Sequence, residues 1–358
     1  MRWSILLPTY NGRPTLEAAV ESVLAQTEAD FELLIVGDGC TDDTAAYVTG
    51  LTDARVRWFD LPKGPGFGYT NRNVALRESQ GEHIAYMAHD DLWAPDHLEL
   101  LGAAFDATGA DFAVTRPQWL SPSGALAPLP VDLVDPVRLA EFRSDFNEVP
   151  AVCVAFTRSA LEAAGWWPED VESAGDWELW KRILAVSDHE PAVVPQATTI
   201  HFRAVWRSSD TRSVDLLDEL SRRHDEWWPA ELVVDLPEQA EGMPVQRALQ
   251  DAISRDPAVW WDSVRRGARL LDGRLATLGL EVPVLEHRIF AHDDVLEEVR
   301  SSNGELAGTI ETLVADLTTA QAYIRQLEDE LLMARSYIEH ANSEISRLSA
   351  PEGEQPPA

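Results

Sequence analysis

The sequence predicts an α/β domain with a mainly parallel sheet flanked by helices, followed by a helical region and a C-terminal coiled coil. Over residues 3–116, short apolar strand patterns alternate with helix patterns, which is typical of parallel strands joined by helical crossovers. From about residue 214 the pattern turns helical, and from residue 306 apolar residues recur at alternating steps of three and four. The last spacing is that of a heptad repeat.

The elements of the first part follow one another in a regular order. Strands are predicted at residues 3–7, 32–36, 56–59, 84–87 and 112–115, and helices near 14–26, 42–50, 69–79 and 96–107. Residues 117–148 are rich in Pro, Leu and Asp and are interpreted as a long excursion. Beyond it we expect a strand at 149–157, a short helix at 158–164, an amphipathic helix at 177–186 and an extended segment at 192–202.

Composition and periodicity divide the chain into four parts. These are an α/β domain (1–213), a helical region (214–292), a coiled coil (293–349) and a disordered tail (350–358) that is rich in Pro and Glu. The helical region carries two tryptophan pairs, Trp227-Trp228 and Trp260-Trp261. We interpret both pairs as core rather than as a binding surface, because such side chains bury a large area.

The coiled coil rests on six unbroken heptads between residues 306 and 348, with Ile or Leu at every a position and Leu or Ala at every d position. A single surface helix drifts by about 20° per heptad from a strict seven-residue repeat, so packing on the chain's own domain explains the pattern less well. We therefore expect residues 296–349 to join copies of the chain into a homo-oligomer, a dimer or trimer.

The chain is strongly acidic, with 61 Asp and Glu residues against 29 Lys and Arg residues and a formal net charge of −32. Such a surface repels nucleic acids and anionic membranes. No segment approaches the run of about 18 apolar residues that a membrane span needs, and the first strand is too short to be a signal peptide. Cys40 and Cys153 lack the spacing of metal ligands. We expect a cytoplasmic protein without an integral membrane segment, with any membrane contact peripheral at the inner face.

Two adjacent carboxylates, Asp90 and Asp91, follow the strand predicted at residues 84–87, and Pro95 then begins a helix. Open α/β sheets bind their ligands at the carboxyl ends of strands, and Mg²⁺ or Mn²⁺ prefers such oxygen ligands together with substrate phosphates. A metal that bridges to a diphosphate is the specific interpretation, and general acidity is the alternative, since Asp-Asp also occurs at 42–43 and 293–294. Without a metal, we expect the pair to face solvent.

Several further motifs occur together in a characteristic order. Residues 4–12 are SILLPTYNG, residues 31–44 are FELLIVGDGCTDDT, and residues 175–182 are GDWELWKR. With the strand that ends at Asp90-Asp91, these motifs closely resemble those of the family 2 glycosyltransferases, and the resemblance covers roughly residues 3–210. It implies the GT-A nucleotide-diphospho-sugar transferase fold.

The resemblance also implies an activity. Family members of this kind are inverting, non-processive, metal-dependent glycosyltransferases of the hexosyltransferase type, with Mg²⁺ or Mn²⁺ as cofactor. The donor would be a nucleotide-diphosphate sugar, a UDP- or dTDP-sugar, and the acceptor a hydroxyl of a glycan, a lipid-linked molecule or a protein. The setting would be the assembly of a cell-surface glycan or glycoconjugate. Outside the motifs of the resemblance, we expect acceptor specificity in residues 117–148 and in the helical region after residue 214.

The resemblance assigns the donor side residue by residue. Pro8, Thr9 and Tyr10 would line the base pocket, and Asp38 would hydrogen-bond a uracil or thymine ring; from composition alone, Asp38 would be a turn former. Arg72 would pair with the diphosphate, because its guanidinium fork suits phosphate oxygens. A solvent-facing Arg72 is the alternative.

At the metal, Asp91 would be the chief ligand and Asp90 would contact the ribose or the metal. His89 is interpreted as a neighbouring packing residue, with a further metal ligand as the alternative. Asp176 would be the catalytic base that removes the proton of the acceptor hydroxyl. The alternative for Asp176 is a helix N-cap before the amphipathic helix.

The sequence departs from the family pattern at four positions. Gly37 and Gly175 replace an Asp and a Glu, Cys40 replaces a Ser, and Val205 replaces a His. We interpret His201 nearby as a packed histidine, with a metal ligand as the alternative. The missing Glu before Asp176 and the missing His leave open a catalytically weak sugar-nucleotide-binding module that acts mainly as an oligomeric scaffold. A sugar nucleotidyltransferase is disfavoured, because residues 8–14 lack its Gly-rich basic loop.

Overall fold

The structure is a computed structural model that describes residues 1–121, 124–128, 131–144, 147, 149–202, 228–234 and 244–277. The predicted coiled coil, the tail and Val205 lie outside the described residues. Among the helices that are described, none is long and apolar enough to cross a membrane.

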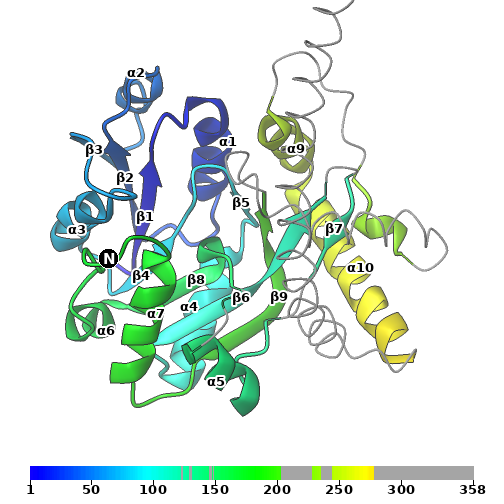
Figure 1. Cartoon of the computed structure of the whole chain (residues 1–358). Helices are drawn as coiled ribbons and strands as arrows, with labels where there is room; N and C mark the ends of the chain where they lie inside the picture. The colour runs from blue at the N-terminus through cyan, green and yellow to red at the C-terminus, as the bar shows by residue number, and fades with distance from the viewer. Residues whose placement is uncertain are drawn as a thin grey trace, which may run out of the picture. The chain divides into compact units, whose positions relative to one another are not determined.

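A mixed sheet forms the centre of the molecule, with its strands in the order β3-β2-β1-β4-β8-β6-β9-β5 and with β7 paired to β6 (Figure 1). The strands are β1 (Trp3–Thr9), β2 (Phe31–Asp38), β3 (Val56–Leu61), β4 (His83–Tyr86), β5 (Leu92–Trp93), β6 (Phe112–Leu120), β7 (Leu126–Ala127), β8 (Val154–Thr157) and β9 (Ala192–His201). Strands β1 to β4 are parallel, as predicted. The other half is mixed, because β8 runs antiparallel to both β4 and β6.

Helices flank this sheet. They are α1 (Arg13–Leu24), α2 (Thr44–Thr49), α3 (Tyr69–Glu78), α4 (His97–Thr108), α5 (Pro136–Ser144), α6 (Arg158–Ala163), α7 (Gly175–Val186), α9 (Val245–Ser254) and α10 (Pro257–Thr277), with short 3₁₀ turns η1 (Ala151–Cys153) and η2 (Ala230–Leu232). Helices α4 and α7 both pack on β6 and lie on opposite sides of the sheet in Figure 1. Helix α4 ends at Gly109, whose φ of 67° is the left-handed conformation common after helices.

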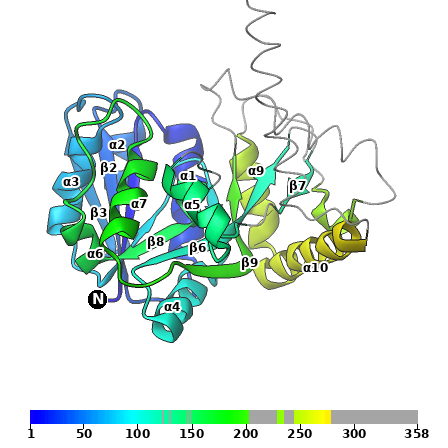
Figure 2. The same cartoon turned by 60° about the horizontal axis from the view of Figure 1, so that its bottom comes forward.

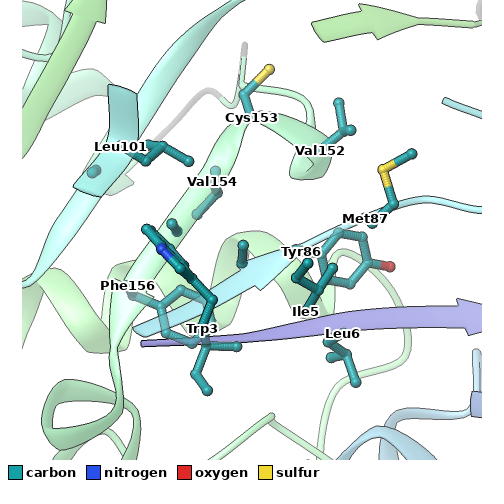
Figure 3. Packing of buried hydrophobic residues seen from close by; sticks show 14 of the residues in the cluster. Trp3, Ile5, Leu6, Tyr86, Met87, Leu101, Val152, Cys153, Val154 and Phe156 are labelled. Atoms are coloured by element: carbon teal, nitrogen blue, oxygen red, sulfur yellow. The ribbon is translucent and has the colours of Figure 1, made fainter. Parts of the chain in front are cut away.

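The core lies on the first strands and the helices around them. Trp3, Ile5 and Leu6 of β1 are fully buried, and Figure 3 shows them beside Tyr86 and Phe156 of the neighbouring strands. Strand β2 is buried along its whole length, as expected for a strand covered on both faces. Burying one such aliphatic or aromatic side chain contributes about 1.5–3 kcal/mol, so this half of the sheet is a rigid support for its strand ends.

The predicted excursion at 117–148 is more ordered than expected. Strand β6 continues to Leu120, and α5 occupies residues 136–144. The Asp135 carboxylate accepts hydrogen bonds from the amides of Val137 and Arg138, which is an N-terminal cap. Leu139 and Phe142 bury the inner side of this helix, and that local pattern was missed among the prolines.

The described part of the helical region packs on the α/β domain, with α9 against α1 and α10 against β9 (Figure 2). Arg265 of α10 makes two hydrogen bonds of 2.7 and 2.8 Å to the carboxylate of Asp96. Trp228 and Trp261 are buried, which confirms the core interpretation for these two residues. Trp260 is half-buried beside Trp261.

Candidate functional site

The candidate site lies at the carboxyl ends of the parallel strands. Thr9 at the end of β1 pairs in register with Gly37 of β2, and Tyr86 ends the adjacent strand β4. Asn11, just past β1, joins two strand ends, because its side-chain oxygen accepts a 2.7 Å hydrogen bond from the amide of Thr41 after β2. The sheet therefore brings the predicted base-pocket residues and the Asp90-Asp91 pair to one edge.

Asp38 is the buried anchor of the loop between β3 and α3. One carboxylate oxygen accepts hydrogen bonds of 2.7 Å from the Gly64 amide and from the side chain of Asn71. The other oxygen forms a 2.6 Å ion pair with Lys63. At Gly68, whose φ is 72°, an added Cβ would lie 2.5 Å from the Asp38 carboxyl carbon. Asp38 therefore does more than form a turn, because its carboxylate holds this loop against the end of β2.

The other predicted base-pocket residues lie beside this anchor. Tyr10 is half exposed, at 50% of its surface, and the Lys63 ammonium lies 3.8 Å from the centre of its ring. Pro8 is partly buried and Thr9 is buried, and the Thr9 hydroxyl has no hydrogen-bond partner in the described part of the chain. The arrangement offers an exposed aromatic face next to a cation, which suits a nucleotide base and its phosphates.

Two departures from the family pattern have direct structural reasons. A Cβ on Gly37 would lie 2.3 Å from the outer edge of the Trp58 ring, so the indole occupies the place of a side chain at that position. The Cys40 thiol points to the carbonyl oxygen of Thr9 at 3.6 Å and so makes a contact of the kind that a serine hydroxyl makes.

Arg72 is turned inward. It is buried, one guanidinium nitrogen donates a 2.9 Å hydrogen bond to the carbonyl of Phe67, and the group lies over the rings of Tyr69 and Trp167 at 5.0 and 4.8 Å. The solvent-facing alternative is therefore wrong, because the guanidinium is enclosed by aromatic rings. Contact with a donor diphosphate stays a prediction.

Asp91 is buried rather than solvent-facing, with 1% of its surface exposed. Its carboxylate accepts a 2.9 Å hydrogen bond from the amide of Phe202 and lies 2.9 Å from Nδ1 of His201. The expectation of a solvent-facing Asp91 was wrong, because the residues at the end of β9 pack against its carboxylate and cover it. The His201 ring packs edge-on to Trp119, and metal ligation by His201 stays an untested alternative.

Asp90 is in a different environment. Burial raises the pKa of its carboxyl, the neighbouring Asp91 carboxylate raises it further, and His89 and His201 act in the opposite direction. In the region that the structure describes, Asp90 has no ion-pair partner. The His89 ring packs against Gly12, where an added Cβ would lie 2.8 Å from the imidazole, which agrees with the packing interpretation.

A divalent cation fits this chemistry. The shielded Asp90 carboxylate, beside a second carboxylate and without a cationic partner among the described residues, is an oxygen donor set of the type that Mg²⁺ and Mn²⁺ prefer. Within the described ranges, no three or more His, Cys, Asp or Glu side chains converge as a preformed metal cage. Substrate phosphates commonly complete such sites.

Asp176 lies in the first turn of α7, which begins at Gly175. The N-cap position belongs to Ala174, whose own side chain makes no capping hydrogen bond. The N-cap alternative for Asp176 is therefore wrong, because the helix begins earlier than the sequence predicted. One Asp176 carboxylate oxygen accepts a 2.9 Å hydrogen bond from the Trp177 amide.

Tyr86, the last residue of β4, is a buried residue that sequence reasoning did not single out. Burial raises the pKa of the Tyr86 hydroxyl, Arg72 lowers it, and the carboxylates of Asp176 and Asp90 both raise it. Asp90 and Asp176 therefore both act electrostatically on this hydroxyl. Sequence reasoning missed Tyr86, Asn71 and Lys63; the one available signal was that Lys63 is one of only two lysines in the chain and lies in a glycine-rich loop.

The parallel half of the sheet, its mixed second half and the carboxylates at the junction between them together define the GT-A fold. Residues 4–156 match the family described as glycosyl transferase family 2, so this part of the chain is similar to the members of that family.

Two curated relatives match its N-terminal part. The chain is 36% identical over 97 residues to the UDP-Glc:alpha-D-GlcNAc-diphosphoundecaprenol beta-1,3-glucosyltransferase WfgD of Escherichia coli, which covers 27% of this chain and 38% of WfgD. It is 35% identical over 111 residues to the succinoglycan biosynthesis protein ExoO of Rhizobium meliloti, covering 31% of this chain and 32% of ExoO. The chain thus spans about a third of the length of these relatives.

Among solved structures, S. aureus TarS 1–349 in complex with UDP-GlcNAc is similar, with a TM-score of 0.48 and 19% sequence identity over 78% of this chain and 92% of that chain.

Proposed function

We propose that this chain transfers a sugar, with inversion, from a nucleoside diphosphate donor to an acceptor hydroxyl in the synthesis of a cell-surface glycan or glycoconjugate. The observation that carries the proposal is the placement of two carboxylates. Asp90 follows the end of β4, and Asp176 lies in the first turn of α7, which α3 ties to the end of β2 through the Gly175–Tyr69 and Asn71–Asp38 hydrogen bonds. One carboxylate is suited to a cation and the other is available to an incoming hydroxyl, which are the two groups that the transfer needs.

On the donor side, the exposed Tyr10 ring would stack on the base. Asp38 would hold Lys63 and Asn71 beside that ring, and a further lone pair of its carboxylate would accept from a pyrimidine N–H. The unpaired Thr9 hydroxyl adds a polar contact at the same strand end. A uridine donor is supported by the name of the relative WfgD, which specifies UDP-Glc.

At the diphosphate, Asp90 would bind Mg²⁺ or Mn²⁺. The bound cation would neutralise the negative charge of the departing diphosphate. Asp91 would keep the neighbouring strands in place through Phe202 and His201, with metal ligation as its second role. Asp176 would accept the acceptor proton while the new glycosidic bond forms.

Replacing the base without removing the donor site tests this assignment. In Asp176→Asn the amide does not accept the acceptor proton, so transfer should fall by about 10²–10⁴-fold, while the calorimetric affinity for UDP and Mn²⁺ should stay unchanged. Asp188→Asn, an exposed position just past the other end of α7, is the control. Transfer by Asp176→Asn at the rate of this control would show that Asp176 is not the base. A wild-type protein that binds donors but neither transfers nor hydrolyses them would instead support the scaffold alternative.

A further inference from the structure

We propose that Tyr69 is a positioning residue for Asp176, so that the first turn of α3 sets the geometry of the catalytic helix. The inference rests on the proposed function, because it assumes that Asp176 is the base. It concerns a contact between two segments that are 106 residues apart in the chain.

The contact is direct. The Tyr69 hydroxyl oxygen accepts a 3.1 Å hydrogen bond from the amide of Gly175, the residue that precedes Asp176. Tyr69 is buried, with 6% of its surface exposed. The first amides of a helix need acceptors from outside the helix, and no side chain at the N-cap supplies one to α7. The tyrosine therefore takes the place of a capping side chain.

The ring of Tyr69 also explains Gly175. A Cβ at position 175 would lie 2.6 Å from Cζ of the ring and 2.9 Å from both adjacent ring carbons. Real contacts at this distance do not occur, so any side chain here would displace the ring. The glycine that replaces the family's glutamate is thus the partner of this tyrosine, and the two positions form one unit.

The backbone before the base is strained, which makes an external support necessary. Ala174 has φ 50° and ψ 37°, a left-handed conformation that residues with a Cβ rarely adopt. Such conformations persist where the surroundings enforce them. The Tyr69 hydroxyl holds the very next residue, so it helps to fix the direction in which α7 begins and Asp176 points.

Helix α3 connects this support to the donor side. Asn71, one half-turn on, donates to Asp38 at the end of β2. Asn73 donates to the carbonyl of Trp167 and accepts from its amide, both at 2.9 Å. The same two turns of α3 therefore hold the base-pocket edge and the segment that leads to Asp176.

The test is Tyr69→Phe, which removes only the hydroxyl. Misplacing a catalytic group slightly lowers the rate of the chemical step, so we expect kcat for transfer to fall by about 10–100-fold. The donor KM and the affinity for UDP should stay within about twofold, because the ring and the Asp38 anchor remain. Tyr47→Phe on α2, a partly buried tyrosine against Arg13, is the matched control. A kcat for Tyr69→Phe equal to that of Tyr47→Phe would overturn the proposal.

A second measurement does not depend on activity. Hydrogen exchange at the Gly175 amide should become faster in Tyr69→Phe than in Tyr47→Phe, because its acceptor is gone. Unchanged protection would contradict the structural basis of the proposal. Gly175→Ala should also lower kcat. The same substitution should lower kcat by less when it is made in a Tyr69→Ser protein, because the clash with the ring is then relieved. Strictly additive effects of the two substitutions would show that the two positions act separately.

Failure here is distinguishable from failure of the proposed function. If Asp176→Asn is inactive and Tyr69→Phe is fully active, Asp176 remains the base and only the positioning role is lost. If Asp176→Asn is fully active, the base assignment itself fails, whatever Tyr69→Phe shows.

Discussion

Removing the carboxylate of Asp90 and removing that of its neighbour Asp91 should have different effects on the stability of the fold. In a protein freed of divalent metal by a chelator, we expect Asp91→Ala to destabilise the fold strongly. We expect Asp90→Ala to leave the free energy of unfolding unchanged or to raise it. Adjacent positions with the same side chain provide each other's control.

The size of the difference follows from the contacts. Removing the Asp91 carboxylate takes away the acceptor of the buried Phe202 amide, which lies 2.9 Å from it. Leaving such a buried donor unpaired costs about 1–3 kcal/mol, which is the loss of stability that we expect for Asp91→Ala. Removing Asp90 takes away a carboxylate whose charge is disfavoured by burial and by Asp91, and it breaks no ion pair among the described residues.

The assay is chemical denaturation of the wild type and both variants, with EDTA present and nucleotide absent, so that ligand binding does not contribute. We expect the midpoint of Asp91→Ala to lie well below the other two, at a similar m-value. Equal midpoints for the two variants, or a larger loss for Asp90→Ala, would refute the different environments inferred for the two residues.

Two further predictions concern the scaffold. Burial lowers the pKa of His97 from 6.5 to about 3. Because the folded-state pKa lies below the unfolded value, the contribution of His97 to folding stability is complete above pH 6.5 and declines as the pH falls, by about 2 kcal/mol at pH 5. Urea unfolding at pH 7 and at pH 5 should therefore show a smaller loss of stability in His97→Gln than in the wild type. Gly66 and Gly68 both have a positive φ, but only at Gly68 would an added Cβ lie against Asp38. Gly68→Ala should therefore be less stable than Gly66→Ala by about 1–3 kcal/mol. Equal denaturation midpoints for the two variants would contradict the anchoring role of Asp38.

The fold was predictable from the sequence where local patterns are strong. The first four parallel strands and the helices between them lie where the alternation placed them, within about two residues, because buried strands and amphipathic helices have distinct periodicities. Helix α5 was missed, because its Asp135 cap and its buried Leu139 and Phe142 are short-range signals within a proline-rich segment.

The site was predictable in position and less so in detail. The order of the motifs predicted that Asp38, Asp90, Asp91 and Asp176 lie at or just beyond the ends of strands and helices, and the structure has them there. Their partners come from distant segments: His201 is 110 residues from Asp91, and Tyr69 is 106 residues from Gly175. Burial and hydrogen bonding of a side chain depend on such long-range contacts, which periodicity does not encode.

The proposed donor site is tested most directly by a thermal-shift screen of nucleotide sugars, with and without Mn²⁺, on the wild type and on Asp90→Ala. Because a ligand that binds only the folded protein stabilises it by mass action, we expect at least one UDP- or dTDP-sugar to raise the melting temperature of the wild type in the presence of Mn²⁺. The same compound should have little effect on Asp90→Ala. No stabilisation of the wild type by any nucleotide sugar, or equal stabilisation of the variant, would contradict a metal-assisted donor site at this edge of the sheet.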